Sequence, residues 1–154
     1  MKPFLLLLVA FVCLQTGHSL AQVKTTSDLI GVFDGRTPCK EFARLLNENL
    51  PANCIKIKWR LTLYKDKGSD TTGRYELIGF VYKNENPRVG TWRITKGSKA
   101  NRNAIVYELK VAGDEPLYLL KLDNNILYFL DQDKRLFIGN KDFSYTLNRI
   151  KKRV

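Results

Sequence analysis

The sequence predicts an all-β protein with one short helix, in which antiparallel strands curl into a small up-and-down barrel. The first observation behind this prediction is the alternation of apolar and polar residues that begins near residue 55. Period two is typical of a half-buried strand. The second is the regular spacing of turn-forming clusters, which divide the chain into about seven or eight short strands. An open sandwich of the same strands is the alternative arrangement.

The strands follow one another without a linker. IKIKWRLTL, residues 55–63, sets apolar side chains against Lys56, Lys58 and Arg60, which would form a wet, basic face. Gly79 is expected at a bulge or bend of the next strand. The further segments expected to be strands are 74–82, 91–95, 104–111, 117–122, 126–130, 136–139 and 143–150, with a turn at 123–125.

One segment has the period of a helix instead. Thr37 is suited to the N-cap and Pro38 to the first helical position. Apolar side chains, among them Phe42, then recur on one face. The helix would end near residue 49, before Pro51. We expect it to lie on the barrel like a lid, between an entry strand and the first long strand.

The N-terminal 21 residues are typical of a secretory signal peptide. Lys2 precedes an apolar run at 4–14, and small Ser19 and Ala21 stand where a cleavage site requires them. The run is too short to span a bilayer, which takes about 20 apolar residues. We therefore expect residues 22–154 to form a single domain that is periplasmic or secreted and does not span the membrane. A lipid anchor is not expected, because Cys13 follows Val12 rather than a small residue.

Cleavage would change the chemical inventory of the chain. It removes the single His, the single Met and one of 26 cations but none of the 15 acids, which leaves 133 residues with a formal charge of +10. Without His, neither a Ser-His-Asp nor a Cys-His apparatus can form. No phosphate-binding or dinucleotide motif is present in the sequence. The composition favours a non-enzymatic protein with no catalytic residues, no metal site and no cofactor.

Cys39 and Cys54 would be the two cysteines of the exported chain. An oxidising compartment favours a disulfide between them, which would tie the helix to the start of the strand at 55–63. Two alternatives stay open. Cys39 lies in the first turn of the expected helix, where the dipole favours the thiolate of a redox switch, and soft thiolates also suit Cu(I).

The basic charge and the barrel interior each indicate a partner. The positive charge favours an anionic partner such as an envelope surface, with Lys56, Lys58 and Arg60 as candidate contacts, although a solvated surface is the simpler interpretation. Nucleic acid is not expected, because most aromatic residues alternate toward the core and not toward the basic face. A small barrel can be filled or can hold a small hydrophobic ligand. The candidate contacts for such a ligand are Phe42, Trp59, Leu61, Trp92, Tyr107, Tyr128 and Tyr145.

GVFDGRTPC, residues 31–39, followed by IKIKWRLTLY, resembles the N-terminal domain of the NlpE family of copper-homeostasis and envelope-stress lipoproteins. GTW at 90–92 and YTLNR at 145–149 resemble further strands of that family. The residues that carry the opening motif are Gly31, Phe33, Gly35, Pro38 and Cys39.

The resemblance implies a lipocalin-like barrel that binds or senses an envelope protein or surface, in envelope stress or copper homeostasis. A lipocalin-like carrier of a small hydrophobic ligand is the alternative function. Phe42 stands where the family has the second cysteine of a Cys-x-x-Cys pair, and the lipid-attachment cysteine is absent. Copper is therefore implied by resemblance alone, without a vicinal cysteine pair.

Overall fold

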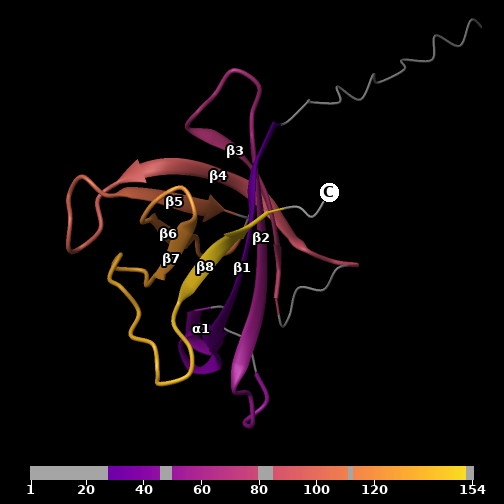
Figure 1. Cartoon of the computed structure of the whole chain (residues 1–154), viewed down its shortest axis with the longest axis vertical. Coiled ribbons are helices and arrows are strands. Elements are labelled where there is room, and N and C mark those ends of the chain that lie inside the picture. Colours follow the sequence, from indigo (N-terminus) through magenta and orange to yellow (C-terminus); the bar gives the residue numbers. More distant parts are fainter. Residues whose placement is uncertain (1–27, 46–49, 80–84, 111–112, 152–154) are drawn as a thin grey trace, which may run out of the picture.

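The computed structural model of this chain describes residues 28–45, 50–79, 85–110 and 113–151. It is a closed barrel of eight antiparallel strands in chain order, in which the last strand pairs with the first (Figure 1). This confirms the predicted fold class, and the β1–β8 pairing excludes the open sandwich. The predicted signal peptide lies outside the described residues. The elements are β1 Asp28–Pro38, α1 Cys39–Leu45, β2 Lys56–Lys65, β3 Thr72–Ile78, β4 Arg88–Lys96, β5 Ile105–Lys110, β6 Leu117–Lys121, β7 Ile126–Leu130 and β8 Thr146–Ile150.

The predicted helix start was wrong. Thr37 and Pro38 continue β1, where they pair with Ile57 and Lys56 of β2, and α1 begins only at Cys39. The fully buried Thr37 hydroxyl does not cap the helix. It accepts a hydrogen bond of 2.9 Å from the indole N–H of Trp59, a donor that burial would otherwise leave unsatisfied. The predicted end of the helix lies outside the described residues.

The chain between β7 and β8 also differs from the prediction. Residues 136–139 form no strand, and only Leu136 makes an isolated bridge, to Leu130. The segment instead turns back beside the end of β7. The ring of Phe137 packs against the core rings of Phe42 and Tyr145, and its carbonyl accepts a hydrogen bond from the hydroxyl of Tyr128. The last strand therefore starts at Thr146, three residues later than predicted from residue 143.

Aromatic side chains fill the part of the interior next to α1. Phe42 is fully buried, and its ring centroid lies 4.8 Å from that of Trp59 and 4.7 Å from that of Phe129. The ring of Tyr145 packs against the same cluster. In Figure 1, α1 lies against the end of the barrel at which β1 finishes and β2 begins. The helix is therefore anchored by a ring that is part of the core.

A buried or partly buried arginine lies toward each end of the barrel. Arg149 of β8 donates to the carbonyls of Ile30 and Asn124, and its guanidinium lies 4.9 Å from the ring centre of Phe33. Arg88, at the start of β4, donates to the hydroxyl of Tyr75. Each guanidinium therefore packs against an aromatic ring or hydroxyl group of a neighbouring strand.

Replacing Phe42 with Ala should lower the free energy of unfolding by about 3–5 kcal/mol, because a ring in full contact with the core leaves a cavity when it is removed. Urea unfolding followed by tryptophan fluorescence measures the loss. Ile138→Ala is the matched control: its side chain is 90% exposed, and its effect should stay within about 0.5 kcal/mol. A similar, small effect of both variants would contradict the placement of α1.

Candidate binding groove on the outer face

The predicted interior contacts pack against one another. Six of them belong to the buried core: Phe42, Trp59, Leu61, Trp92, Tyr107 and Tyr145. Trp92 and Tyr107 meet edge to face at 5.3 Å, and the Trp92 indole donates to the carbonyl of Tyr64. Burial raises the pKa of Tyr145 to about 12, so its phenol stays neutral. These side chains act as core residues in the structure.

Tyr128 is the exception, because it is only partly buried and packs against this core without belonging to it. Its neighbours in β7, Leu127 and Phe129, are the residues that are buried in the core. Alternation therefore places Tyr128 on the opposite, outer face of the strand, where its hydroxyl donates to the carbonyl of Phe137 at 2.6 Å. The ring is half-buried and packs against the core.

The predicted disulfide is confirmed. Cys39, the first residue of α1, is bonded to Cys54, which lies just before β2, with a Cα–Cα separation of 6.0 Å. The bond joins the helix to the start of the strand that carries Trp59. Among the described residues, no group of three His, Cys, Asp or Glu side chains could hold a metal ion.

The three predicted basic contacts all lie on the outer face of β2, but their environments differ. Arg60 makes two hydrogen bonds of 2.8 and 2.9 Å to the carboxylate of Asp34, which raises the pKa of the guanidinium first through the hydrogen bond and then through the charge. Lys56 lies 5.5 Å from the ring centre of Phe143. Lys58 has no side-chain partner in the described part of the chain.

Lys58 lines a groove of about 570 Å³ that runs across β8, β1 and β2. Arg36 stands directly opposite Lys58 in the β1–β2 register. On the β8 side, Thr146 and Asn148 alternate with the buried Tyr145 and Leu147. They therefore point outward and line the groove. The groove lining consists of Asp34, Gly35, Arg36, Lys58, Trp59, Arg60, Ile78, Asp142, Phe143, Ser144, Thr146 and Asn148.

Sequence reasoning found only the β2 side of this groove. The β1–β8 pairing joins segments of chain that are as far as 119 residues apart, and no local pattern indicates that pairing. For Arg36 the sequence did carry a signal. It lies two residues after Asp34 in the same strand, and residues two apart point to the same face. The lining holds three cations and two acids, Asp34 and Asp142. The groove is therefore polar, with a small excess of positive charge.

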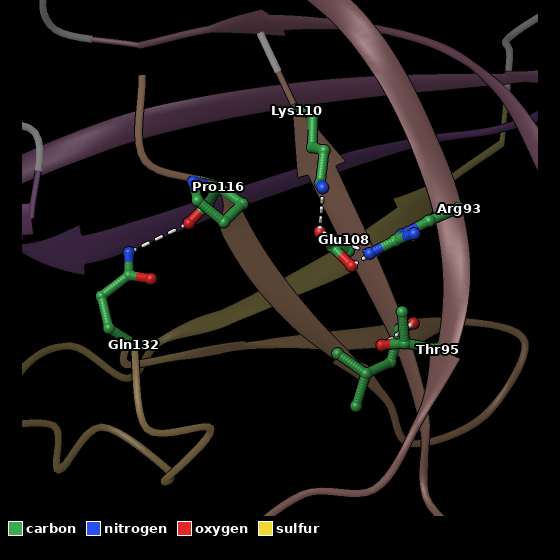
Figure 2. A network of polar contacts seen from close by, with 7 residues as sticks. Arg93, Thr95, Glu108, Lys110, Pro116 and Gln132 are labelled. Atoms are coloured by element: carbon green, nitrogen blue, oxygen red, sulfur yellow. Dashed lines mark hydrogen bonds and ion pairs between the residues drawn. The ribbon is translucent and has the colours of Figure 1, made fainter. Parts of the chain in front are cut away.

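A second polar cluster lies on the outer face of β4 and β5 (Figure 2). The carboxylate of Glu108, which is only 4% exposed, accepts two hydrogen bonds from Arg93, at 2.8 and 3.2 Å, and contacts Lys110 at 2.9 Å. Burial alone would raise the pKa of Glu108. The bonds from Arg93 and Lys110 outweigh it, and the net pKa is lowered. Glu108 is therefore ionised at neutral pH and joins the two strands.

Comparisons with known protein families, with curated proteins and with solved structures found no match to this chain. The helix in the described part of the chain is neither long nor apolar enough to cross a membrane.

Replacing both cysteines with Ser should lower the free energy of unfolding of residues 22–154 by about 3 kcal/mol, because the bond closes a loop of 15 residues in the unfolded chain. Urea unfolding measures the loss. Reduction of the wild type should reproduce it, and a reducing agent should leave the double variant unchanged. Free thiols at both positions in the unreduced wild type would contradict the bond.

Glu108→Gln should cost about 1–2 kcal/mol of stability near pH 7, because it removes charge-assisted hydrogen bonds whose cationic partners are half-exposed. The folded-state pKa of Glu108 is depressed. Its contribution is therefore present above the unfolded pKa of about 4.3 and is lost as the pH falls through the lower folded value. Unfolding curves between neutral and acidic pH should converge for wild type and variant. The exposed Glu76→Gln serves as the control, and a difference that persists in acid would contradict this account.

Proposed function

We propose that this chain is an exported, non-enzymatic domain of the NlpE type that binds or senses a partner at the bacterial envelope. The observation that carries the proposal is spatial. The two segments with the resemblance, 31–39 and 145–149, lie far apart in the sequence and form neighbouring strands in the barrel. Arg149 from the second segment lies over the ring of Phe33 from the first.

The motif residues serve the closure of the barrel. A Cβ atom at Gly31 would lie 2.6 Å from Nη1 of Arg149, so Gly31 leaves space for the guanidinium. A Cβ atom at Gly35 would lie 2.3 Å from the carbonyl oxygen of Thr146, so Gly35 allows β1 to approach β8. Cys39 forms the disulfide. The motif is thus explained by packing, and it supports a shared fold more directly than a shared chemistry.

Binding at the outside of the barrel fits this domain better than a ligand inside it. The aromatic residues that would line an internal site are in contact with one another, with Phe42 at their centre. The outer groove offers exposed cations, and the formal charge of +10 on residues 22–154 attracts anionic surfaces. We therefore favour an anionic partner at the envelope over the carrier function. A copper role would first require reduction of the Cys39–Cys54 bond.

Cell fractionation tests the proposal with the complete chain. The protein should be recovered from the envelope or the medium, with Cys39 and Cys54 oxidised, and the purified protein should sediment with isolated envelopes at low salt. Raising the ionic strength should release it, because exposed charges more than about 10 Å apart are screened near 0.1 M salt. Deletion of residues 2–21 is the matched control and should leave the protein in the cytoplasm. Cytoplasmic recovery of the complete chain, or failure to sediment with envelopes, would contradict the proposal.

A further inference from the structure

Two cations of the outer groove are placed where they weaken the sheet. Arg36 and Lys58 face each other directly across β1 and β2, and like charges in opposite positions of an antiparallel pair are destabilising. Neither side chain has a hydrogen-bond or ion-pair partner within the described residues. Two register positions along the same strands, Asp34 and Arg60 are opposite in charge and form an ion pair with two hydrogen bonds. The barrel itself therefore gives no reason for the cationic pair.

The side chains that line the groove from residue 144 to residue 148 are uncharged and rich in hydrogen-bonding groups. The hydroxyls of Ser144 and Thr146 lie 2.6 Å apart, and the amide of Asn148 follows on the same face of β8. These groups both donate and accept hydrogen bonds, as the hydroxyls of a sugar require. Phe143 adds a partly exposed aromatic ring at the border, which can pack against the apolar face of a sugar ring.

The charge of the lining limits the ligand further. Asp34 neutralises Arg60, and Asp142 supplies a second acid, so three cations are set against two acids. A densely charged polyanion would meet the two carboxylates along the groove. A ligand with one negative group among neutral hydroxyls would place that group between Arg36 and Lys58 and its hydroxyls against β8. The volume of about 570 Å³ is in the usual range of small-molecule sites.

We propose that this groove binds a carboxylated saccharide, with the carboxylate held between Arg36 and Lys58. The guanidinium of Arg36 presents a planar pair of donors that matches a carboxylate, and Lys58 adds a point charge from the neighbouring strand. Ser144, Thr146 and Asn148 contact the sugar hydroxyls. This inference rests on the proposed function, because it assigns the anionic partner at the envelope to acidic glycans.

Calorimetric titration of residues 22–154 with two short oligosaccharides tests the saccharide class: one carries a single galacturonate and the other a single glucuronate, each among neutral sugars. At least one of them should bind, and the same oligosaccharide with its carboxylate reduced to an alcohol should bind at least about tenfold more weakly. Arg36→Gln and Lys58→Gln should each weaken binding of the acidic form by about tenfold with little effect on the reduced form. Arg36→Lys should restore part of the affinity, because it keeps the charge without the planar donors.

The control variant is Lys67→Gln/Lys99→Gln, which removes two exposed loop cations outside the groove. It should leave binding unchanged, and unfolding curves should show that all variants are folded. The saccharide proposal is overturned if neither acidic oligosaccharide binds, if the reduced form binds equally well, or if the control variant loses as much affinity as the groove variants. It is also overturned if phosphatidylglycerol vesicles bind through Arg36 and Lys58 more tightly than the oligosaccharides do.

The two proposals fail in different ways. Protein that still sediments with envelopes but binds neither acidic oligosaccharide would overturn the saccharide site and leave the envelope function standing. A complete chain that stays in the cytoplasm while the purified domain binds an acidic oligosaccharide would overturn the envelope function alone.

Discussion

The close approach of β1 and β8 is the constraint on which the rest of the structure depends. β1 and β8 must come within hydrogen-bonding distance of each other around an interior that is filled with core side chains. Gly35 makes the approach possible, because a side chain there would meet the backbone of Thr146. Arg149 then joins β8 to the other end of β1 by donating to the carbonyl of Ile30. In a barrel closed in this way, each described strand has a hydrogen-bonded neighbour on both sides.

The same closure forms the groove that we propose as the binding site. With β8 beside β1, the outward side chains of three strands share one surface, and the groove with Arg36 and Lys58 is formed across them. The inside is occupied, because Phe42 reaches from α1 into contact with Trp59 and Phe129. One backbone arrangement thus accounts both for the packed interior and for a polar outer groove. For this reason we look for binding on the outside of the barrel.

The fold was largely predictable because period-two alternation is a local signal, and it predicted a strand at each of β2 through β7. The failures came from contacts that are distant in sequence. Thr37 and Pro38 are good local signals for a helix start, but pairing with β2 and the indole N–H of Trp59 hold Thr37 in a strand. Tyr128 resembles a core residue by type, but it alternates with the buried Phe129 and packs against the core only while partly buried. The β8 side of the groove was missed because only closure brings Thr146 and Asn148 beside Arg36.

Phe42 is the position at which this chain departs from the family that it resembles. In the resemblance it stands where the second cysteine of the pair would lie, three residues after Cys39. Here that position is fully buried and filled by an aromatic ring, while the sulfur partner of Cys39 comes from Cys54, at the approach to β2. A ring and a long-range disulfide fix the same short helix from two sides. Because the disulfide uses both thiols that a thiolate site would need, the helix acts as a structural closure of the barrel. The binding site that we propose lies instead on the outer face of the strands.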